Sequence, residues 1–174
     1  MPWWDTTIEV LISDYLAPVM GSLVLMGMWF MGTGETRLRN QFVTICGTMS
    51  VGFASGAVGI INGFYFRTRP FIDLDLDLLF YQPTDSSFPA NTTAVGFAMA
   101  AAVFIRRRRL GLALFGLAFL WGFARVYSGI HYPSDVLAGG AIGIAAAGLG
   151  LGLTQLLSPL LRLVLRVPRA FYLA

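Results

Sequence analysis

Five long apolar runs constrain the fold of this chain more than any other feature of its sequence. The runs cover residues 16–32, 41–64, 91–105, 110–126 and 134–156, and nearly all charged residues lie between them. About 20 apolar residues can cross a bilayer as a helix, and lipid offers no partner to an open backbone. Only 12% of the residues are charged, about half of the fraction usual in soluble domains. The sequence therefore predicts an all-α integral membrane protein, a bundle of five transmembrane helices in a single membrane domain, residues 1–174.

The two ends of the chain differ from these runs. Residues 1–15 carry two tryptophans at positions 3 and 4, followed by acids that alternate with aliphatic residues, a pattern typical of a helix at the membrane interface. Residues 160–174 carry three arginines among leucines, which predicts an amphipathic helix on the membrane surface. A sixth short span over the same residues is the alternative.

The arginines are divided unevenly between the two faces of such a bundle. Five spans place a polar turn over residues 32–40, the Arg106–Arg109 run and the tail on one side, with nine arginines and one acid. The other side carries the N-terminus, the 65–90 loop and the 127–133 turn, with eight acids and three arginines. Because arginine-rich loops stay in the cytoplasm, the partition predicts an N-terminus outside a bacterial-type plasma membrane and a cytoplasmic C-terminus. The arginine run is then a topology anchor and not a nucleic-acid patch.

One polar stretch, residues 124–135, contains the only histidine of the chain. Arg125 lies six residues before His131, and Asp135 lies four residues after it. Ionisable groups in apolar surroundings are costly and mark candidate functional sites. On a helix that starts near Tyr132, His131 and Asp135 would share a face. The aspartate could then hold one imidazole nitrogen protonated and leave the other free to attack or to take a proton. A structural histidine beside an Arg–Asp pair that anchors the helix is the alternative.

The other arginines of the predicted outer face follow the second apolar run. Arg67 and Arg69 open a long polar loop over residues 65–90, and loops of this length are often functional. The charge bias disfavours arginines on this face, so these two and Arg125 need another role. The planar guanidinium of arginine pairs bidentately with phosphate. Three arginines, a histidine and an aspartate at one face predict a phosphate site open to the outer leaflet, with a lipid phosphate as its natural substrate.

The stretch around His131 resembles the third motif of the type 2 phosphatidic acid phosphatase superfamily, Ser-Arg-x5-His-x3-Asp. The matching residues are Arg125, His131 and Asp135, with Ala124 in place of the serine. The resemblance covers roughly residues 40–157. Within the superfamily, the chain looks closest to small bacterial undecaprenyl-diphosphatases of the bacitracin-resistance type.

The first two motifs of the family are altered in this chain. The first, Lys-x6-Arg-Pro, keeps its arginine as Arg69, but Asn62 stands at the lysine position. Arg67 could supply that positive charge from a different spacing. The second motif, Pro-Ser-Gly-His, falls on residues 89–92, where Thr92 stands at the histidine position.

The resemblance implies a role for each retained residue. In the family the third-motif histidine attacks phosphorus and forms a phosphohistidine, so His131 would be the nucleophile and Asp135 would orient it. Arg69 and Arg125 would hold the phosphate oxygens as charge develops on them. The second-motif histidine protonates the leaving group, and Thr92 cannot readily replace it. The family chemistry needs no metal, so the resemblance implies no cofactor.

Two further groups of polar residues have two interpretations each. Asn91 and Thr92 could donate hydrogen bonds to phosphate from a helix N-terminus, or they only cap the third span. Asp73, Asp75 and Asp77 alternate along the outer loop and could form a cation site. A solvated edge is the simpler interpretation of these three acids.

The missing acid bears on which lipid the protein could hydrolyse. General acid catalysis contributes about 10²–10⁴-fold. A lipid monophosphate expels an alkoxide, which needs a proton, whereas a diphosphate expels a phosphate whose second pKa is about 6. The sequence thus favours a polyprenyl diphosphatase, whose partners are a phosphorylated lipid and the surrounding membrane lipids. The alternatives are a family member that binds, senses or transports such a lipid without hydrolysis, and an assembly partner with no catalytic role. The sequence does not predict an oligomeric state.

Overall fold

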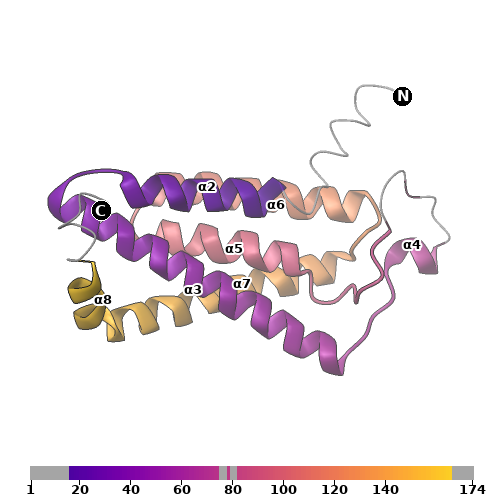
Figure 1. Cartoon of the computed structure of the whole chain (residues 1–174). Helices are drawn as coiled ribbons and strands as arrows, with labels where there is room; N and C mark the ends of the chain where they lie inside the picture. Colours follow the sequence, from indigo (N-terminus) through magenta and orange to yellow (C-terminus); the bar gives the residue numbers. More distant parts are fainter. Residues whose placement is uncertain (1–15, 75–77, 79–81, 166–174) are drawn as a thin grey trace.

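The computed structural model describes residues 16–74, 78 and 82–165, and every regular element in these ranges is a helix (Figure 1). The helices are α2 (Leu16–Phe30), α3 (Gly34–Phe64), α4 (Pro70–Asp73), α5 (Asn91–Phe104), α6 (Arg108–Tyr127), α7 (Pro133–Leu156) and α8 (Ser158–Val164). The predicted all-α membrane fold is confirmed. The predicted interfacial helix over residues 1–15 lies outside the described residues.

The five apolar runs correspond to α2, α3, α5, α6 and α7. Among the described residues, α3, α6 and α7 are long and apolar enough to cross a membrane, whereas α2 and α5 are apolar but shorter, with 15 and 14 residues. Helix α5 is the centre of the bundle and contacts α2, α3, α6 and α7 (Figure 1). Most of its residues are buried. Helix α5 therefore packs mainly against other helices and not against lipid.

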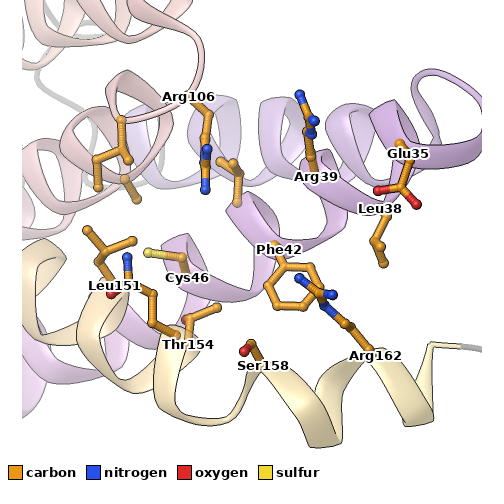
Figure 2. Close-up of a pocket in the computed structure, with 14 residues that line it drawn as sticks. Glu35, Leu38, Arg39, Phe42, Cys46, Arg106, Leu151, Thr154, Ser158 and Arg162 are labelled. Carbon is orange, nitrogen blue, oxygen red and sulfur yellow. The ribbon is translucent and has the colours of Figure 1, made fainter.

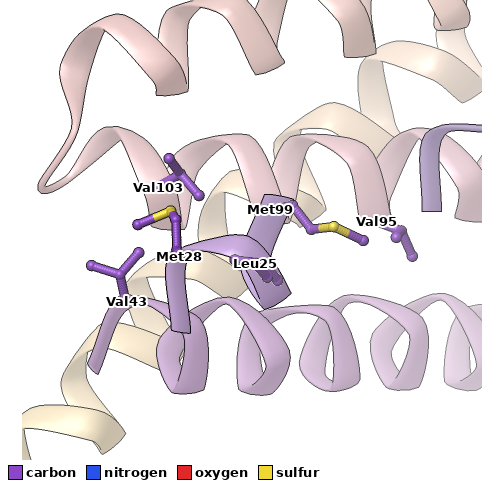
Figure 3. Close-up of a cluster of buried hydrophobic side chains, with 6 residues drawn as sticks. All are labelled: Leu25, Met28, Val43, Val95, Met99 and Val103. Carbon is purple, nitrogen blue, oxygen red and sulfur yellow. The ribbon is translucent and has the colours of Figure 1, made fainter. Parts of the chain in front are cut away.

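A small apolar cluster fastens α2 to the rest of the bundle. Its buried members are Leu25 and Met28 of α2, Val43 of α3, and Val95, Met99 and Val103 of α5 (Figure 3). Unbranched methionines fill irregular gaps between helices of different direction. The contact holds α2 against the start of α3 and the middle of α5.

The turn between α2 and α3 is shorter than the sequence predicts. A polar turn over residues 32–40 was expected, but α3 begins at Gly34 and its first two turns carry the charged residues. Gly32 and Gly34 adopt positive φ angles of 88° and 53°, which lets the chain reverse within three residues. Asn40 donates to the carbonyl of Met31 (2.8 Å) and accepts from Nε of Arg107 (3.2 Å). These two hydrogen bonds hold this turn against the turn between α5 and α6.

The tail helix is described only in part. Helix α8 contains seven residues, none of them buried, and it follows α7 after a bend at Leu157. Seven residues are too few to cross a bilayer. The described part of the tail is therefore not a sixth span, and residues 166–174 lie outside the described residues.

Glycines of α7 allow it to pack closely against α5. A Cβ atom on Gly139 would collide with the carbonyl oxygen of Ala90, and one on Gly143 with that of Ala94. Small residues allow helix backbones to approach closely in lipid. The backbone N–H of Ala90 also donates to the carbonyl of Asp135 (3.1 Å). This contact fixes the start of α7 against the start of α5.

We predict that Gly143→Ala destabilises the protein whereas Gly148→Ala does not. The first methyl group meets α5 backbone, and overpacking of this kind costs about 1–3 kcal/mol. Gly148 lies on the same helix with no atom within 4 Å of its added Cβ. Thermal unfolding of both variants in detergent measures the difference. Equal midpoints would show that the α5–α7 contact does not depend on Gly143.

Candidate active site

The predicted site residues converge at one end of the bundle. Asn62 lies near the end of α3, Arg125 near the end of α6, and Asp135 in the first turn of α7. Six of the eight predicted residues line one cavity of about 440 Å³, namely Asn62, Arg69, Asn91, Thr92, Arg125 and His131. The other two, Arg67 and Asp135, pair with each other beside it.

His131 is buried in the turn that precedes α7. Its Nδ1 lies 2.9 Å from the carbonyl oxygen of Ser87, and a carbonyl can only accept, so Nδ1 carries the proton. Its Nε2 lies 3.4 Å from an Nη1 atom of both Arg69 and Arg125. Because guanidinium groups only donate, Nε2 presents its lone pair to the cavity between two cations.

The surroundings keep this imidazole neutral. Burial, followed by the charges of Arg69 and Arg125, lowers the pKa of His131 from 6.5 to about 3. The hydrogen bond to the carbonyl of Ser87 acts in the opposite direction. A neutral imidazole with a free Nε2 lone pair is the form that can attack an electrophile or accept a proton.

Asp135 does not hold the imidazole directly, contrary to the sequence-based expectation. Its Oδ2 atom is 3.9 Å from Nδ1 of His131 and instead accepts hydrogen bonds from Oγ of Ser87 (2.5 Å) and the backbone N–H of Tyr132 (2.9 Å). The reason is that α7 begins only at Pro133. From the first turn, the carboxylate reaches back to the residue that caps the helix.

Ser87 is the residue that connects these two groups, and the sequence analysis missed it. Its hydroxyl donates to Asp135 while its carbonyl accepts from His131. The carboxylate thus orients the imidazole through one intervening residue. The only signal in the sequence was that Ser87 stands two residues before the altered second motif.

Arg67 occupies a different place from the one predicted. It was expected to contact phosphate, but its Nη1 donates to Oδ1 of Asp135 (2.7 Å) and to Ser134 (2.8 Å). Its guanidinium also lies over the ring of Tyr132, 4.0 Å from the centroid. It does not belong to the residues that line the cavity. Its charge is therefore directed at the buried carboxylate.

The two arginines beside His131 are both buried, but their partners differ. Arg69 donates from Nη2 to Oδ1 of Asp85 (2.6 Å), from Nε to the Asp85 carbonyl (3.1 Å) and from Nη1 to the carbonyl of Ile130 (3.3 Å). The Asp85 side chain is 69% exposed and also lines the cavity. Arg125 lies 5.4 Å from the Trp121 ring centroid. Asp85 was not identified from the sequence, because nothing in its local pattern separates it from the other acids of the loop.

Two polar atoms of the cavity wall have no hydrogen-bond partner among the described residues. They are Oδ1 of Asn62 and Oγ1 of Thr92, at the positions of the family's lysine and histidine. A buried polar atom without a partner costs free energy unless a ligand or water satisfies it. Both atoms are therefore suited to contact a polar group held in the cavity.

Asp73, the one described member of the alternating acids, has a local structural role. It accepts hydrogen bonds from the hydroxyl of Tyr132 (2.7 Å) and from Oγ1 of Thr68 (2.9 Å), and these two contacts lower its pKa. Asp75 and Asp77 lie outside the described residues. The contact with Tyr132 ties α4 to the turn that carries His131.

Comparison with known proteins identifies the family. A family model described as the PAP2 superfamily matches residues 42–158. "Undecaprenyl-diphosphatase BcrC" of Bacillus subtilis (strain 168) is 32% identical over 171 residues, covering 94% of this chain and 82% of that protein. "Putative undecaprenyl-diphosphatase YbjG" of Escherichia coli (strain K12) is 30% identical and covers 84% of this chain and 73% of that protein. The crystal structure of Aquifex aeolicus LpxE has a TM-score of 0.69 at 27% identity, with 87% of each chain covered.

A helical bundle with a neutral histidine between two arginines, together with these similarities, defines an integral membrane phosphatase. The chain belongs to the PAP2 superfamily, as the resemblance of its third motif predicts.

We predict that His131 stays neutral, with the proton on Nδ1, from about pH 8 to about pH 5. Its pKa is lowered, so the folded protein takes up this proton only as the pH falls toward about 3. The unfolded chain binds it near 6.5, and stability is therefore lost as the pH falls below that value. Imidazole ¹⁵N NMR measures the tautomer without ambiguity because the chain has one histidine. Arg125→Gln serves as the control and should raise the pKa. A midpoint between about pH 6 and 7 in the native protein would contradict the structure.

Proposed function

We propose that this protein hydrolyses a polyprenyl diphosphate through a phosphohistidine on His131. The observation that carries the proposal is the position of Nε2, which faces the cavity unprotonated and lies 3.4 Å from a guanidinium nitrogen of both Arg69 and Arg125. Nε2 would attack the terminal phosphorus, and the bond from that phosphorus to the bridging oxygen would break. The lipid monophosphate would leave with the electron pair. Water would then cleave the N–P bond, which releases inorganic phosphate and restores neutral His131.

The arginines supply the charge that such a reaction needs. Nη1 atoms of Arg69 and Arg125 converge on Nε2, so both would lie against the oxygens of a phosphoryl group bound at that atom. Positioning and charge stabilisation account for most of phosphoryl-transfer catalysis. Thr92 would donate a further hydrogen bond from its unsatisfied hydroxyl, and Asn91 could donate one from the start of α5. Oδ1 of Asn62 can only accept, so it would hold the attacking water instead of a phosphate oxygen.

The leaving group decides between a monophosphate and a diphosphate substrate. Thr92 stands where the family places its acid, and the described cavity wall contains no second histidine. A departing phosphate, with a second pKa of about 6, needs little help from an acid. This argument supports a diphosphate, and it agrees with the names of the Bacillus and Escherichia relatives.

The shape of the cavity and the charge distribution support a lipid substrate on the outer face. Pro18 of α2 and Val95 of α5 give the cavity an apolar wall between two helices, where a prenyl chain could lie. The exposed arginines Arg39, Arg106 and Arg162 lie at the opposite end of the bundle, which the positive-inside rule assigns to the cytoplasm. The N-terminus and the active site would then be extracytoplasmic.

The decisive experiment measures phosphate release by the purified protein from a polyprenyl diphosphate and a matched monophosphate. We expect release from the diphosphate, at least about 10²-fold faster than from the monophosphate, because an alkoxide leaves poorly without an acid. His131→Ala should reduce it to background, while Thr92→Ala should lower it only about tenfold or less, because it loses one hydrogen bond to phosphate and no acid. Binding of both lipids without release in any variant would instead favour a lipid-phosphate binder or transporter.

We further predict that Asp85→Asn lowers the KM for the diphosphate several-fold. In the structure Nη2 of Arg69 donates a hydrogen bond to the Asp85 carboxylate. A phosphate oxygen would compete for the same donor. Removal of the carboxylate charge weakens its hydrogen bond to Arg69, so phosphate meets less competition. The matched control is Asp73→Asn, since Asp73 belongs to the same connection but contacts Thr68 and Tyr132. An unchanged or raised KM in Asp85→Asn would show that phosphate does not displace this carboxylate.

A further inference from the structure

A second cavity lies at the other end of the bundle, between the start of α3, the end of α5 and the junction of α7 with α8 (Figure 2). Its volume is about 480 Å³, similar to that of the active-site cavity. On α3, Arg39 of this cavity and Asn62 of the active-site cavity are 23 residues apart, roughly 35 Å at 1.5 Å per residue. This exceeds the bilayer core of about 30 Å. The two cavities therefore belong to opposite faces of the membrane.

The rim of the second cavity is positively charged. Arg39 comes from α3, Arg106 from the turn after α5 and Arg162 from α8, while Glu35 is the one acid on the lining. Three arginines against one glutamate leave a net charge of +2. Within the described residues, none of these arginines takes part in a salt bridge or a side-chain hydrogen bond. Figure 2 shows Arg106 and Arg162 extending into the cavity from opposite sides.

The wall between these arginines is apolar. Phe42 and Cys46 of α3 and Leu151 of α7 line it (Figure 2). These three side chains are buried or half-buried, whereas the arginines are exposed. Ser158 adds a hydroxyl group, while the hydroxyl of Thr154 already donates to the carbonyl of Gly150. A pocket with exposed cations beside more deeply buried apolar side chains is complementary to an amphiphile with an anionic head. Arginine matches phosphate in geometry as well as in charge.

We infer that this cavity binds the headgroup of an anionic phospholipid of the membrane leaflet opposite the active site. The phosphate lies between Arg106 and Arg162, and the first part of an acyl chain packs on Phe42 and Leu151. Such a lipid bridges α8 to α3 and α5; among the described residues α8 otherwise packs only against α7. The inference does not depend on the reaction proposed for His131, because it concerns other residues at the other membrane face.

The test is retention of phosphatidylglycerol by the delipidated full-length protein in detergent, measured by native mass spectrometry. Phosphatidylglycerol is a phosphodiester and so is not a substrate for release of terminal phosphate. Phosphatidylcholine with the same acyl chains is the neutral-headgroup control. We expect the triple variant Arg39→Gln, Arg106→Gln, Arg162→Gln to bind phosphatidylglycerol at least about tenfold more weakly, because charge-assisted hydrogen bonds are lost.

A matched variant distinguishes binding in this cavity from general electrostatic attraction of the lipid to the arginine-rich end of the bundle. Arg37→Gln, Arg108→Gln, Arg109→Gln removes the same charge from the same end of the bundle, but these residues do not line the cavity. It should retain phosphatidylglycerol as the native protein does. Equal losses in the two triple variants would overturn the inference in favour of surface charge alone. Competition by inorganic phosphate at the lipid's own concentration would show an anion site without a lipid component, and it would also overturn the inference.

A second measurement uses the native protein and needs no arginine variant. Cys46 is the only cysteine of the chain, and it lines this cavity. Phosphatidylglycerol should slow its modification by a small neutral thiol reagent about tenfold relative to phosphatidylcholine, because a bound lipid covers the wall. Equal rates in the two lipids would contradict occupation of the cavity. Phosphatase activity, assayed in the same preparations, reports separately on the proposed reaction.

Discussion

The buried carboxylate of Asp135 is the group on which the rest of the active site depends. It has no exposed surface, and its oxygens accept hydrogen bonds from Arg67, Ser87 and the backbone of Tyr132. A buried charge is costly unless it is paired and hydrogen-bonded. These donors come from the connection after α3, the connection before α5 and the cap of α7. The need to satisfy one carboxylate therefore brings together the segments that carry Arg69, Ser87 and His131.

Ser87 links the hydrogen bonding of Asp135 to the orientation of the His131 imidazole. Its hydroxyl is fixed by Asp135, so its own carbonyl, a few bonds away, has a defined position and accepts the Nδ1 proton of His131. The carboxylate is thus kept out of contact with the imidazole, at 3.9 Å. A direct ion pair would favour the protonated ring, whose Nε2 could not attack. The neutral carbonyl of Ser87 selects the tautomer with the proton on Nδ1. It stabilises the imidazolium less than a carboxylate in the same place would.

The fold was largely accessible from the sequence because lipid permits few solutions for long apolar runs. The same reasoning failed at residues 32–40, where charged residues continue a helix beyond its apolar part and composition cannot separate that from a turn. Arg125, His131 and Asp135 were identified because they lie within one short stretch between apolar runs. Asp85 and Ser87 were not, because their roles depend on the path of a connection with no periodicity. Arg67 was assigned to phosphate because its charge was visible in the sequence, whereas its partner, a carboxylate 68 residues away, was not.

The two cations beside His131 also explain why an exposed acid belongs in this site. Buried guanidinium groups without an anion are unfavourable, and Asp85 offsets Arg69 when phosphate is not bound. Because this carboxylate remains largely in water, its hold on Arg69 is weaker than that of a buried partner would be. In the proposed reaction it would therefore yield to an incoming phosphate at modest cost. After hydrolysis it would return to Arg69 and compete with the inorganic phosphate. The same contact would then weaken substrate binding and assist product release, so we expect its strength to set a balance between the two steps.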